Sequence, residues 1–410
     1  MNGKRRCLLS GIVTGLALLL VGCGDDLSAT LPLTDLETVE EVYTEEEFFS
    51  EDTINIEDDR EEIPKQQESS TEEVVEGEES EPAEEEAVEI EKTTITISAA
   101  GDCSLGNYYM QDYHISFDQT YEKVQDEGYF FQNVKEIFET DDMTIVNLEG
   151  VLTTSEELEP DRTYNIKGDP SYVGILTAGS VEAVSMANNH RQDYGKAGTE
   201  DTVEALEGAE IVYAYDDIVG IYEAKGIKIG IVSVNEVAWG TGSETFIRNG
   251  IASLKEQEAD LIIACCHWGV EKDNFTEEYQ NKLGRICIEE GADLVLGHHP
   301  HVLQGIEEYN GKYIVYSLAN FCFGANRNPA DKDTMIFQQT FTFFDGELQE
   351  EMRARVIPCS VSSVKERNNY QPTPLEGEEA ARVIDRLNLY SEAYGIFIDE
   401  GGVIGSSLSQ

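Results

Sequence analysis

Apolar and β-branched residues form five short runs along the chain, and each run ends in a polar side chain. Runs of this length and composition are typical of buried strands. Between several of them, apolar residues recur every three or four positions, which predicts helices. The predicted strands occupy residues 93–100, 144–149, 183–190, 260–267 and 293–301, and the predicted helices 130–138, 198–206 and 277–289.

The pattern changes after residue 301, where alternating apolar positions and turn sequences predict hairpins. Strands that alternate with helices predict parallel pairing, with polar residues gathered at the carboxyl ends of the strands. Together the two patterns predict an α/β fold, a layered α/β sandwich of mixed sheets. The later strands are expected at 302–307, 313–317, 334–344 and 352–357, followed by one helix at 374–390.

The distribution of charge identifies a segment that is not expected to fold. The 410 residues include 82 acidic and 28 basic ones, a net charge of −54, so nucleic acid is not an expected partner. Residues 35–91 alone hold 26 acidic and 2 basic residues. The segment has too few apolar side chains for their burial to offset the conformational entropy lost on folding. This segment is therefore predicted to be a disordered, extended linker.

The first 23 residues read as a targeting segment. Lys4, Arg5 and Arg6 precede an apolar run at 8–21 that is too short to span a bilayer comfortably, and Cys23 follows. The segment resembles a bacterial lipoprotein signal, which implies lipidation at Cys23 and an anchor on the outer face of the cytoplasmic membrane. An uncleaved anchor or a plain secretory signal is the alternative.

These features predict a signal peptide at 1–23, an acidic linker at 24–91, a folded domain at 92–365 and a C-terminal extension with one helix at 366–410. Six cysteines remain after the signal and Cys23, and their spacing shows no disulfide framework. Most are expected to be buried and apolar in role, and one pairing among them stays open.

Histidine carries the most information about chemistry. Five of the six histidines fall at or just beyond the ends of predicted strands, together with carboxylates and an amide. Imidazole, carboxylate and amide oxygen suit a divalent ion of the Mn, Fe, Zn or Co type, and a carboxylate can bridge two ions. The polar residues at these ends are Asp102, Glu149, Asn189, His190, His267, His299 and His301.

Six ordered motifs resemble the CapA family of poly-γ-glutamate capsule biosynthesis proteins, a branch of the calcineurin-like metallophosphoesterase superfamily. The resemblance covers residues 95–325 and implies two packed mixed sheets flanked by helices, with metal ligands on connecting loops. The motifs are Gly101-Asp102, Asn147-Leu148-Glu149-Gly150, Ala187-Asn188-Asn189-His190 with Asp193, His267-Trp268-Gly269-Val270-Glu271, Gly297-His298-His299-Pro300-His301 and Tyr316-Ser317-Leu318-Ala319-Asn320-Phe321.

The resemblance also implies roles for single residues. His190 looks like the residue that faces the phosphate, Asp193 would hold its ring, and Glu271 would support His267 or be a ligand itself. One or two divalent ions are implied. The metal ligands implied are Asp102, Glu149, Asn189, His267, His299 and His301.

This chain departs from the superfamily in its first motif, which is usually Asp-x-His and here reads Asp102-Cys103-Ser104. The missing imidazole favours a metal-binding but non-catalytic scaffold or export component of capsule machinery. Asn189, His190 and Asp193 favour an enzyme, a metal-dependent hydrolase or transferase that acts on a phosphoester or on a γ-glutamyl or other cell-envelope polymer. A phosphodiesterase of nucleotides or envelope phosphodiesters is a further alternative.

The expected partners follow from both readings. They are the membrane, through the N-terminal lipid, capsule-synthesis membrane proteins, and an anionic polymer or phosphoester substrate. An acidic domain repels a polyanion unless metal ions or a local basic patch bridge the two. The candidate cations for that patch are Arg162, Lys167, Arg191 and Lys196.

Overall fold

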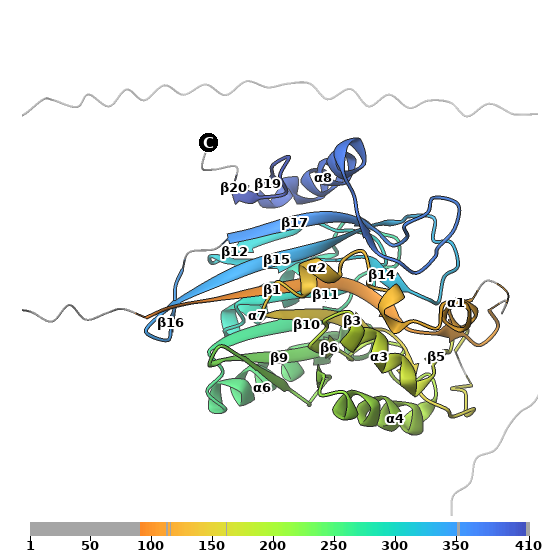
Figure 1. Cartoon of the computed structure of the whole chain (residues 1–410). Coiled ribbons are helices and arrows are strands. Elements are labelled where there is room, and N and C mark those ends of the chain that lie inside the picture. Colours follow the sequence, from red (N-terminus) through yellow and green to blue (C-terminus); the bar gives the residue numbers. More distant parts are fainter. Residues whose placement is uncertain (1–90, 112–113, 115, 161, 351–352, 407–410) are drawn as a thin grey trace, which may run out of the picture. The chain divides into compact units, whose positions relative to one another are not determined.

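The computed structural model describes residues 91–406, apart from 112–113, 115, 161 and 351–352 (Figure 1). The predicted signal peptide, Cys23 and the acidic linker up to residue 90 lie outside the described residues. Within the described part, no helix is both long and apolar enough to cross a membrane.

Nine strands form the first sheet, in which β1, Lys92–Ser104, is central. β1 pairs in parallel with β3 and β14 and antiparallel with β15, so the sheet is mixed. The remaining order is β18-β17-β15-β1-β3-β6-β7, with β16 beside β15. These strands are β3 Met143–Leu148, β6 Ala183–Ser185, β7 Val212–Ala214, β14 Asn320–Phe323, β15 Asp333–Phe344, β16 Glu347–Leu348, β17 Arg353–Ser360 and β18 Thr373–Pro374.

The second sheet has six strands in the order β12-β13-β11-β10-β9-β8. Its four middle strands are parallel, and the two edge strands run antiparallel to their neighbours. Its strands are β8 Gly220–Ala224, β9 Ile227–Asn235, β10 Leu261–His267, β11 Leu294–His298, β12 Ile306–Tyr309 and β13 Lys312–Val315. Two small sheets add β2 Asn107–Tyr108, β4 Val151–Leu152, β5 Ile166–Gly168, β19 Ile396–Ile398 and β20 Ile404–Ser406.

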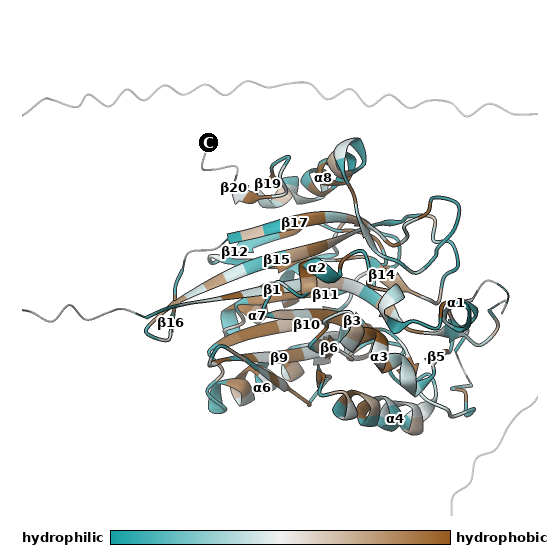
Figure 2. Ribbon diagram, viewed as in Figure 1, coloured by the Kyte–Doolittle hydropathy of each residue, from teal (hydrophilic) through white to brown (hydrophobic). Residues whose placement is uncertain are grey.

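Helices cover the outer faces of the two large sheets (Figures 1 and 2). One apolar cluster lies between the sheets and includes Ile97 of β1, Ile231 of β9 and Ile263 of β10. Two further clusters lie between each sheet and its helices, so the domain is layered helix, sheet, sheet, helix. The helices are α1 Phe117–Val124, α2 Lys135–Phe138, α3 Val173–Ala178, α4 Gly195–Gly208, α5 Glu236–Trp239, α6 Ser243–Glu256, α7 Glu278–Glu290 and α8 Gly377–Ser391.

This architecture confirms the predicted fold class, an α/β sandwich of two mixed sheets flanked by helices. The predicted strand at 183–190 is wrong at its end, because β6 stops at Ser185 and the residues after it form a loop with a turn. The predicted helix at 130–138 is mostly turns and contains only the four-residue α2.

The segment after residue 360 packs into the same core as the two sheets. Val383, Ile384 and Leu387 of α8 belong to the cluster between the sheets, with Ile396 and Ile404 of the last small sheet. The six cysteines of the described part are buried, as expected for most of them, and all six are free. The Sγ atoms of Cys266 and Cys287 lie 3.9 Å apart.

Candidate metal centre

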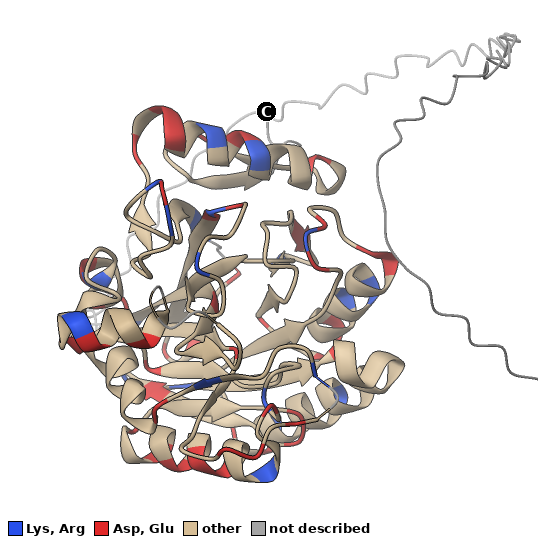
Figure 3. Ribbon diagram, turned by 90° about the vertical axis from the view of Figure 1, so that its right-hand side faces the viewer, with Lys and Arg blue, Asp and Glu red and all other residues tan. Residues whose placement is uncertain are grey.

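The carboxyl ends of strands from both large sheets meet at one end of the domain. β1, β3 and β6 of the first sheet deliver Asp102, Glu149 and the loop after Ser185, while β10 and β11 of the second deliver His267 and His298. Figure 3 views the domain from this side, where acidic and basic segments lie close together on the loops. Ligand sites form at such ends because the loops that follow parallel strands converge there.

Asp102, Glu149 and His267 form the centre of this cluster. Each is fully buried or nearly so, and each offers a ligand atom within 4.8 Å of those of the other two. Buried Asn147 joins them, because its Nδ2 lies 2.9 Å from Asp102 Oδ1, 3.4 Å from Glu149 Oε2 and 3.5 Å from His267 Nδ1. The two sheets are therefore linked at the cluster by a polar network.

The loop after β11 adds two further imidazoles. His301 Nδ1 lies 3.1 Å from Asp102 Oδ2, and its Nε2 lies 3.6 Å from Glu149 Oε1. The His299 ring centre is 4.7 Å from that of His267. His299 and His301 have φ angles of 94° and 58°, in the left-handed region that non-glycine residues rarely adopt. Such strain is often found at functional sites, where the surrounding structure holds it in place.

The loop after β6 brings an amide and a fourth imidazole. Asn189 Oδ1 lies 2.9 Å from His267 Nε2. His190 Nε2 lies 3.8 Å from Glu149 Oε1, while its Nδ1 lies 2.6 Å from Asp193 Oδ2. The buried Asp193 also accepts hydrogen bonds from Arg162 and from the Ile166 N–H, so its orientation is fixed.

Charge in the cluster is distributed unevenly. Burial opposes ionisation of Asp102, but hydrogen bonds with His298 and His301 hold its pKa well below the usual range. Burial raises the pKa of Glu149 well above its usual range. Burial lowers the pKa of His299 to about 4, whereas for His301 the opposing effect of the Glu149 and Asp102 carboxylates prevails and raises the pKa to about 9.

The donor set fits a divalent metal ion. Glu149 Oε1 and His299 Nδ1 are buried and have no hydrogen-bond partner among the described residues. Buried polar atoms without a partner are costly unless something else satisfies them. A metal ion would satisfy both, and carboxylate, imidazole and amide oxygen are ligands of the Mn, Fe, Zn and Co group.

The remaining sequence candidates lie around this centre. Ser104, at the end of β1, is fully buried and its Oγ has no hydrogen-bond partner in the described part of the chain. Glu271 lines a pocket of about 770 Å³ above the cluster, together with His190 and His301. Glu271 makes no hydrogen bond to His267 among the described residues, so the expected support of His267 by Glu271 stays a prediction.

The four cations that the sequence analysis named as able to meet an anionic substrate lie in ion pairs. Each is paired with a carboxylate, which neutralises it, and none lines the pocket. The pairs are Arg162 with Asp193, Lys167 with Glu156, Arg191 with Asp216 and Lys196 with Glu200.

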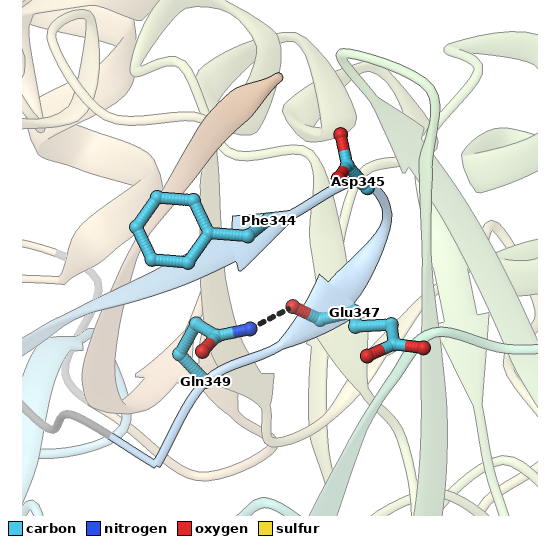
Figure 4. Close-up of a pocket in the computed structure, with 4 residues that line it drawn as sticks. All are labelled: Phe344, Asp345, Glu347 and Gln349. Atoms are coloured by element: carbon cyan, nitrogen blue, oxygen red, sulfur yellow. Dashed lines mark hydrogen bonds between the residues drawn. The ribbon is translucent and has the colours of Figure 1, made fainter. Parts of the chain in front are cut away.

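A second hollow, of about 430 Å³, lies at the turn between β15 and β16 (Figure 4). Phe344, Asp345, Glu347 and Gln349 line it, and the Gln349 amide donates a hydrogen bond to the Glu347 carbonyl. The Glu91 N–H donates to Asp345, which places the hollow beside the start of β1, at the opposite end of that strand from Asp102. No histidine or cysteine lines it, so it offers carboxylates without the mixed ligands of the cluster.

Sequence reasoning missed the residues that organise the centre. Asn147 and Asn188 were quoted only as parts of motifs, yet Asn188 Nδ2 donates to Asn147 Oδ1 and to the Leu148 carbonyl. His298 was quoted in the same way, and its Nδ1 lies 3.3 Å from Asp102 Oδ1. Each of these residues lies in, ends or follows an apolar run. This position next to a buried strand is the feature of the sequence that could have identified them.

Comparison with known proteins agrees with these features. Residues 96–325 match the family model described as "Bacterial capsule synthesis protein PGA_cap". The chain is 31% identical over 252 residues to "PGA biosynthesis protein CapA" of Bacillus subtilis (strain 168), covering 56% of this chain and 63% of that protein. It is 27% identical over 220 residues to "Capsule biosynthesis protein CapA" of Bacillus anthracis, covering 48% and 54%.

The chain thus spans less than two thirds of the length of these relatives. A crystal structure of a hypothetical protein from Thermus thermophilus is similar with a TM-score of 0.40 and 15% identity, covering 64% of this chain and 99% of that one. The family model matches more than half of the 410 residues and includes every strand end that builds the cluster. This chain belongs to the bacterial capsule synthesis protein PGA_cap family.

Proposed function

We propose that this protein acts in the synthesis or processing of capsule poly-γ-glutamate, through a divalent-metal centre of phosphoesterase type. Membership of the capsule synthesis family and the names of the Bacillus relatives support the role in capsule synthesis. The buried group of Asp102, Glu149 and His267 supports the metal centre.

The residues that would hold the metal are those of the cluster. The buried donors Asp102, Glu149 and His267 would be joined by Asn189, His299 and His301, with room for one or two ions of the Mn, Fe, Zn or Co type. Such an ion, when bound, polarises a substrate oxygen and lowers the pKa of a coordinated water.

His190 is positioned for proton transfer. Asp193 holds its Nδ1 at 2.6 Å, so the Nε2 atom is directed to the Glu149 side of the pocket. An imidazole fixed in this way can give a proton to a leaving oxygen or stabilise charge in the transition state, which is worth about 10²–10⁴-fold in rate. Asp193 acts through His190, because it fixes the tautomer and the orientation of the ring.

The His190–Asp193 pair is the observation that favours an enzyme over a metal-binding scaffold. A structural metal site needs ligands, but it does not need an oriented imidazole that faces a pocket of about 770 Å³. The scaffold remains the competing proposal because Ser104 stands where the superfamily carries an imidazole.

A kinetic comparison tests this proposal. The metal-reconstituted chain is assayed on short γ-linked oligoglutamate and on a chromogenic phosphodiester, as wild type, His190→Ala and Gln192→Ala. We expect His190→Ala to lose about 10²–10⁴-fold in turnover and to keep its metal, whereas Gln192→Ala, exposed in the same loop, behaves as wild type. Normal turnover by His190→Ala would reject the catalytic role, and metal without turnover in the wild type would favour the scaffold.

Lipid anchoring at Cys23 and a location on the outer face of the cytoplasmic membrane remain part of the proposal. The signal at 1–23 carries Lys4, Arg5 and Arg6 before an apolar run, which supports export and anchoring. A membrane-anchored position would bring the domain close to capsule-synthesis membrane proteins, the partners proposed for it.

A further inference from the structure

A cysteine of the second sheet and a cysteine of the helix that covers it are neighbours in the core. Cys266 is the last residue but one of β10, Cys287 lies in the last turn of α7, and their Sγ atoms are 3.9 Å apart. Both side chains are fully buried in the apolar cluster between this sheet and its helices. Each sulfur therefore has the other as a neighbour in an apolar environment.

The alternation of side chains along β10 separates this pair from the cysteine before it and from the metal centre. Cys265 belongs to the cluster between the two sheets, whereas Cys266 belongs to the cluster on the opposite face, beside α7. His267, the next residue, faces the first sheet again, where its Nδ1 lies 3.5 Å from Asn147 Nδ2. The two sulfur atoms thus lie behind the strand end that carries a proposed metal ligand and face away from the metal centre.

The chain between the two cysteines, residues 267–286, lies against the loop that carries His299 and His301. Both histidines have φ angles in the left-handed region, so the shape of their loop depends on the structure around it. The bonds between segment and loop run from the Trp268 N–H to the His298 carbonyl, from the Lys272 N–H to the Pro300 carbonyl, and from Asn274 Nδ2 to the Leu303 carbonyl. A constraint on residues 267–286 would therefore also steady the loop that holds two proposed ligands.

We propose that Cys266 and Cys287 are a site of disulfide formation, and that the bond closes residues 267–286 into a covalent ring behind the metal centre. The sulfur atoms must approach from 3.9 Å to about 2 Å, a movement on the scale of a change of side-chain rotamer. A cross-link between residues 21 positions apart limits how far the chain between them can open. The inference rests on the proposed location only for the source of the oxidant, because disulfides persist outside the cytoplasm.

The bond forms by exchange with a small organic disulfide such as oxidised glutathione. One cysteine loses its proton and its thiolate attacks the oxidant, which releases one glutathione thiol and leaves a mixed disulfide. The second cysteine attacks that mixed disulfide in the same way, which forms the S–S bond and releases the second glutathione thiol. Two electrons and two protons pass from the cysteines to the oxidant. Because both sulfurs are buried, the exchange takes place during folding or during local opening of α7.

Peptide mapping tests the site directly. The full chain is treated with a mixture of reduced and oxidised glutathione, both as the native protein and during refolding from urea. Free thiols are then alkylated, the protein is digested without reduction, and linked peptides are identified by mass spectrometry. The variants are Cys287→Ala and, as the matched control, Cys265→Ala, which removes a buried thiol from the other face of the same strand.

We expect a peptide that links Cys266 to Cys287 in the wild type and in Cys265→Ala. Amide hydrogen exchange across 268–277 and 298–304 should be about tenfold slower in the oxidised wild type than in the reduced one, and the same in both states of Cys287→Ala.

Three results would overturn the inference: free thiols at both positions in the native and refolded wild type, a link from either cysteine to a different one, or equal exchange in the oxidised and reduced wild type. None of these measurements requires bound metal or turnover. A failure of the proposed function would instead appear as a folded chain that takes up no metal.

Discussion

Asn147 connects the two sheets at the centre of the molecule. Its Nδ2 approaches Asp102 and Glu149 of the first sheet and His267 of the second, and its side-chain Oδ1 accepts a hydrogen bond from Asn188 Nδ2. Residues that hydrogen-bond to ligand side chains fix their orientation and are worth about 10–100-fold in metal affinity.

Asn147→Ala should therefore weaken metal binding about 10–100-fold without unfolding the domain. A competition titration with a chromophoric chelator measures the affinity, and circular dichroism checks the fold. Asn133→Ala, which removes an exposed amide that contacts Thr373, is the control. Equal affinity in the wild type and Asn147→Ala would show that the hydrogen bonds of Asn147 do not organise the centre.

Glu182 gives a pH dependence that is independent of the metal centre. Burial raises its pKa to about 7, and its Oε2 accepts the Thr144 N–H at 2.7 Å. A carboxyl whose pKa is higher in the folded state binds protons more readily there than in the unfolded chain. The free energy of unfolding therefore falls as pH rises from the unfolded pKa near 4.5 through about 7.

Glu182→Gln should remove this fall in the free energy of unfolding at high pH. At about pH 8 the variant should have a higher free energy of unfolding than the wild type, and the difference should shrink towards about pH 5. Urea denaturation at several pH values measures it, with the exposed Glu223→Gln as control. A variant that is less stable than the wild type at high pH would show that the ionised carboxylate stabilises the fold.

At the scale of elements, ion pairs join α8 to the start of β15 and to the loop 324–332 before it, which lines the pocket beside the metal centre. The Asp333 carboxylate, 7% exposed at the start of β15, accepts from Arg382 at 2.6 and 2.8 Å and also from Arg386. Burial by itself raises the pKa of Asp333, but the two guanidinium groups lower it below its usual value. The stabilisation is thus present above the unfolded pKa and is lost as pH falls through the lower folded pKa.

Asp333→Asn should lower the free energy of unfolding at neutral pH by about 1–2 kcal/mol, because it removes charge-assisted hydrogen bonds from partly exposed arginines. It should also speed amide hydrogen exchange in the loop 324–332. Glu379→Gln, which breaks only an exposed pair with Arg382, is the comparison and should change little. Unchanged exchange in the loop would mean that the hydrogen bonds from Asn368 to this loop hold it without α8.

Elements whose apolar runs end in polar residues could be predicted from the sequence. The strand ends that carry Asp102, Glu149, His267 and His298 were found in this way, since the side chain period and the polar terminus are both local signals. β9 was missed even though it is a nearly continuous apolar run, as was the short β14 that delivers Asn320.

At the scale of the whole molecule, the domain is proposed to work at the membrane surface. The acidic segment at 35–91 and the signal before it lie almost wholly outside the described residues. The proposal of a lipid anchor therefore rests on the amino-acid sequence alone. A lipid at Cys23 would tether the domain through this charged segment.

Cys23→Ser should release the protein from membranes into the soluble fraction. Cell fractionation with immunoblotting measures the distribution, and Cys7→Ser, within the same signal, is the matched control that should stay bound. Full membrane retention of Cys23→Ser would indicate an uncleaved anchor in place of the lipid.

The central claim is that strand ends of the two sheets build a metal centre. Elemental mass spectrometry on the purified full chain, before and after incubation with Mn, Fe, Zn or Co salts, tests it most directly when wild type and Asp102→Ala are compared. The predicted result is one or two ions of this group per wild-type chain and loss of metal in Asp102→Ala, because Asp102 is one of the three buried residues whose ligand atoms lie close together. A folded wild type that takes up none of these metals would contradict the claim.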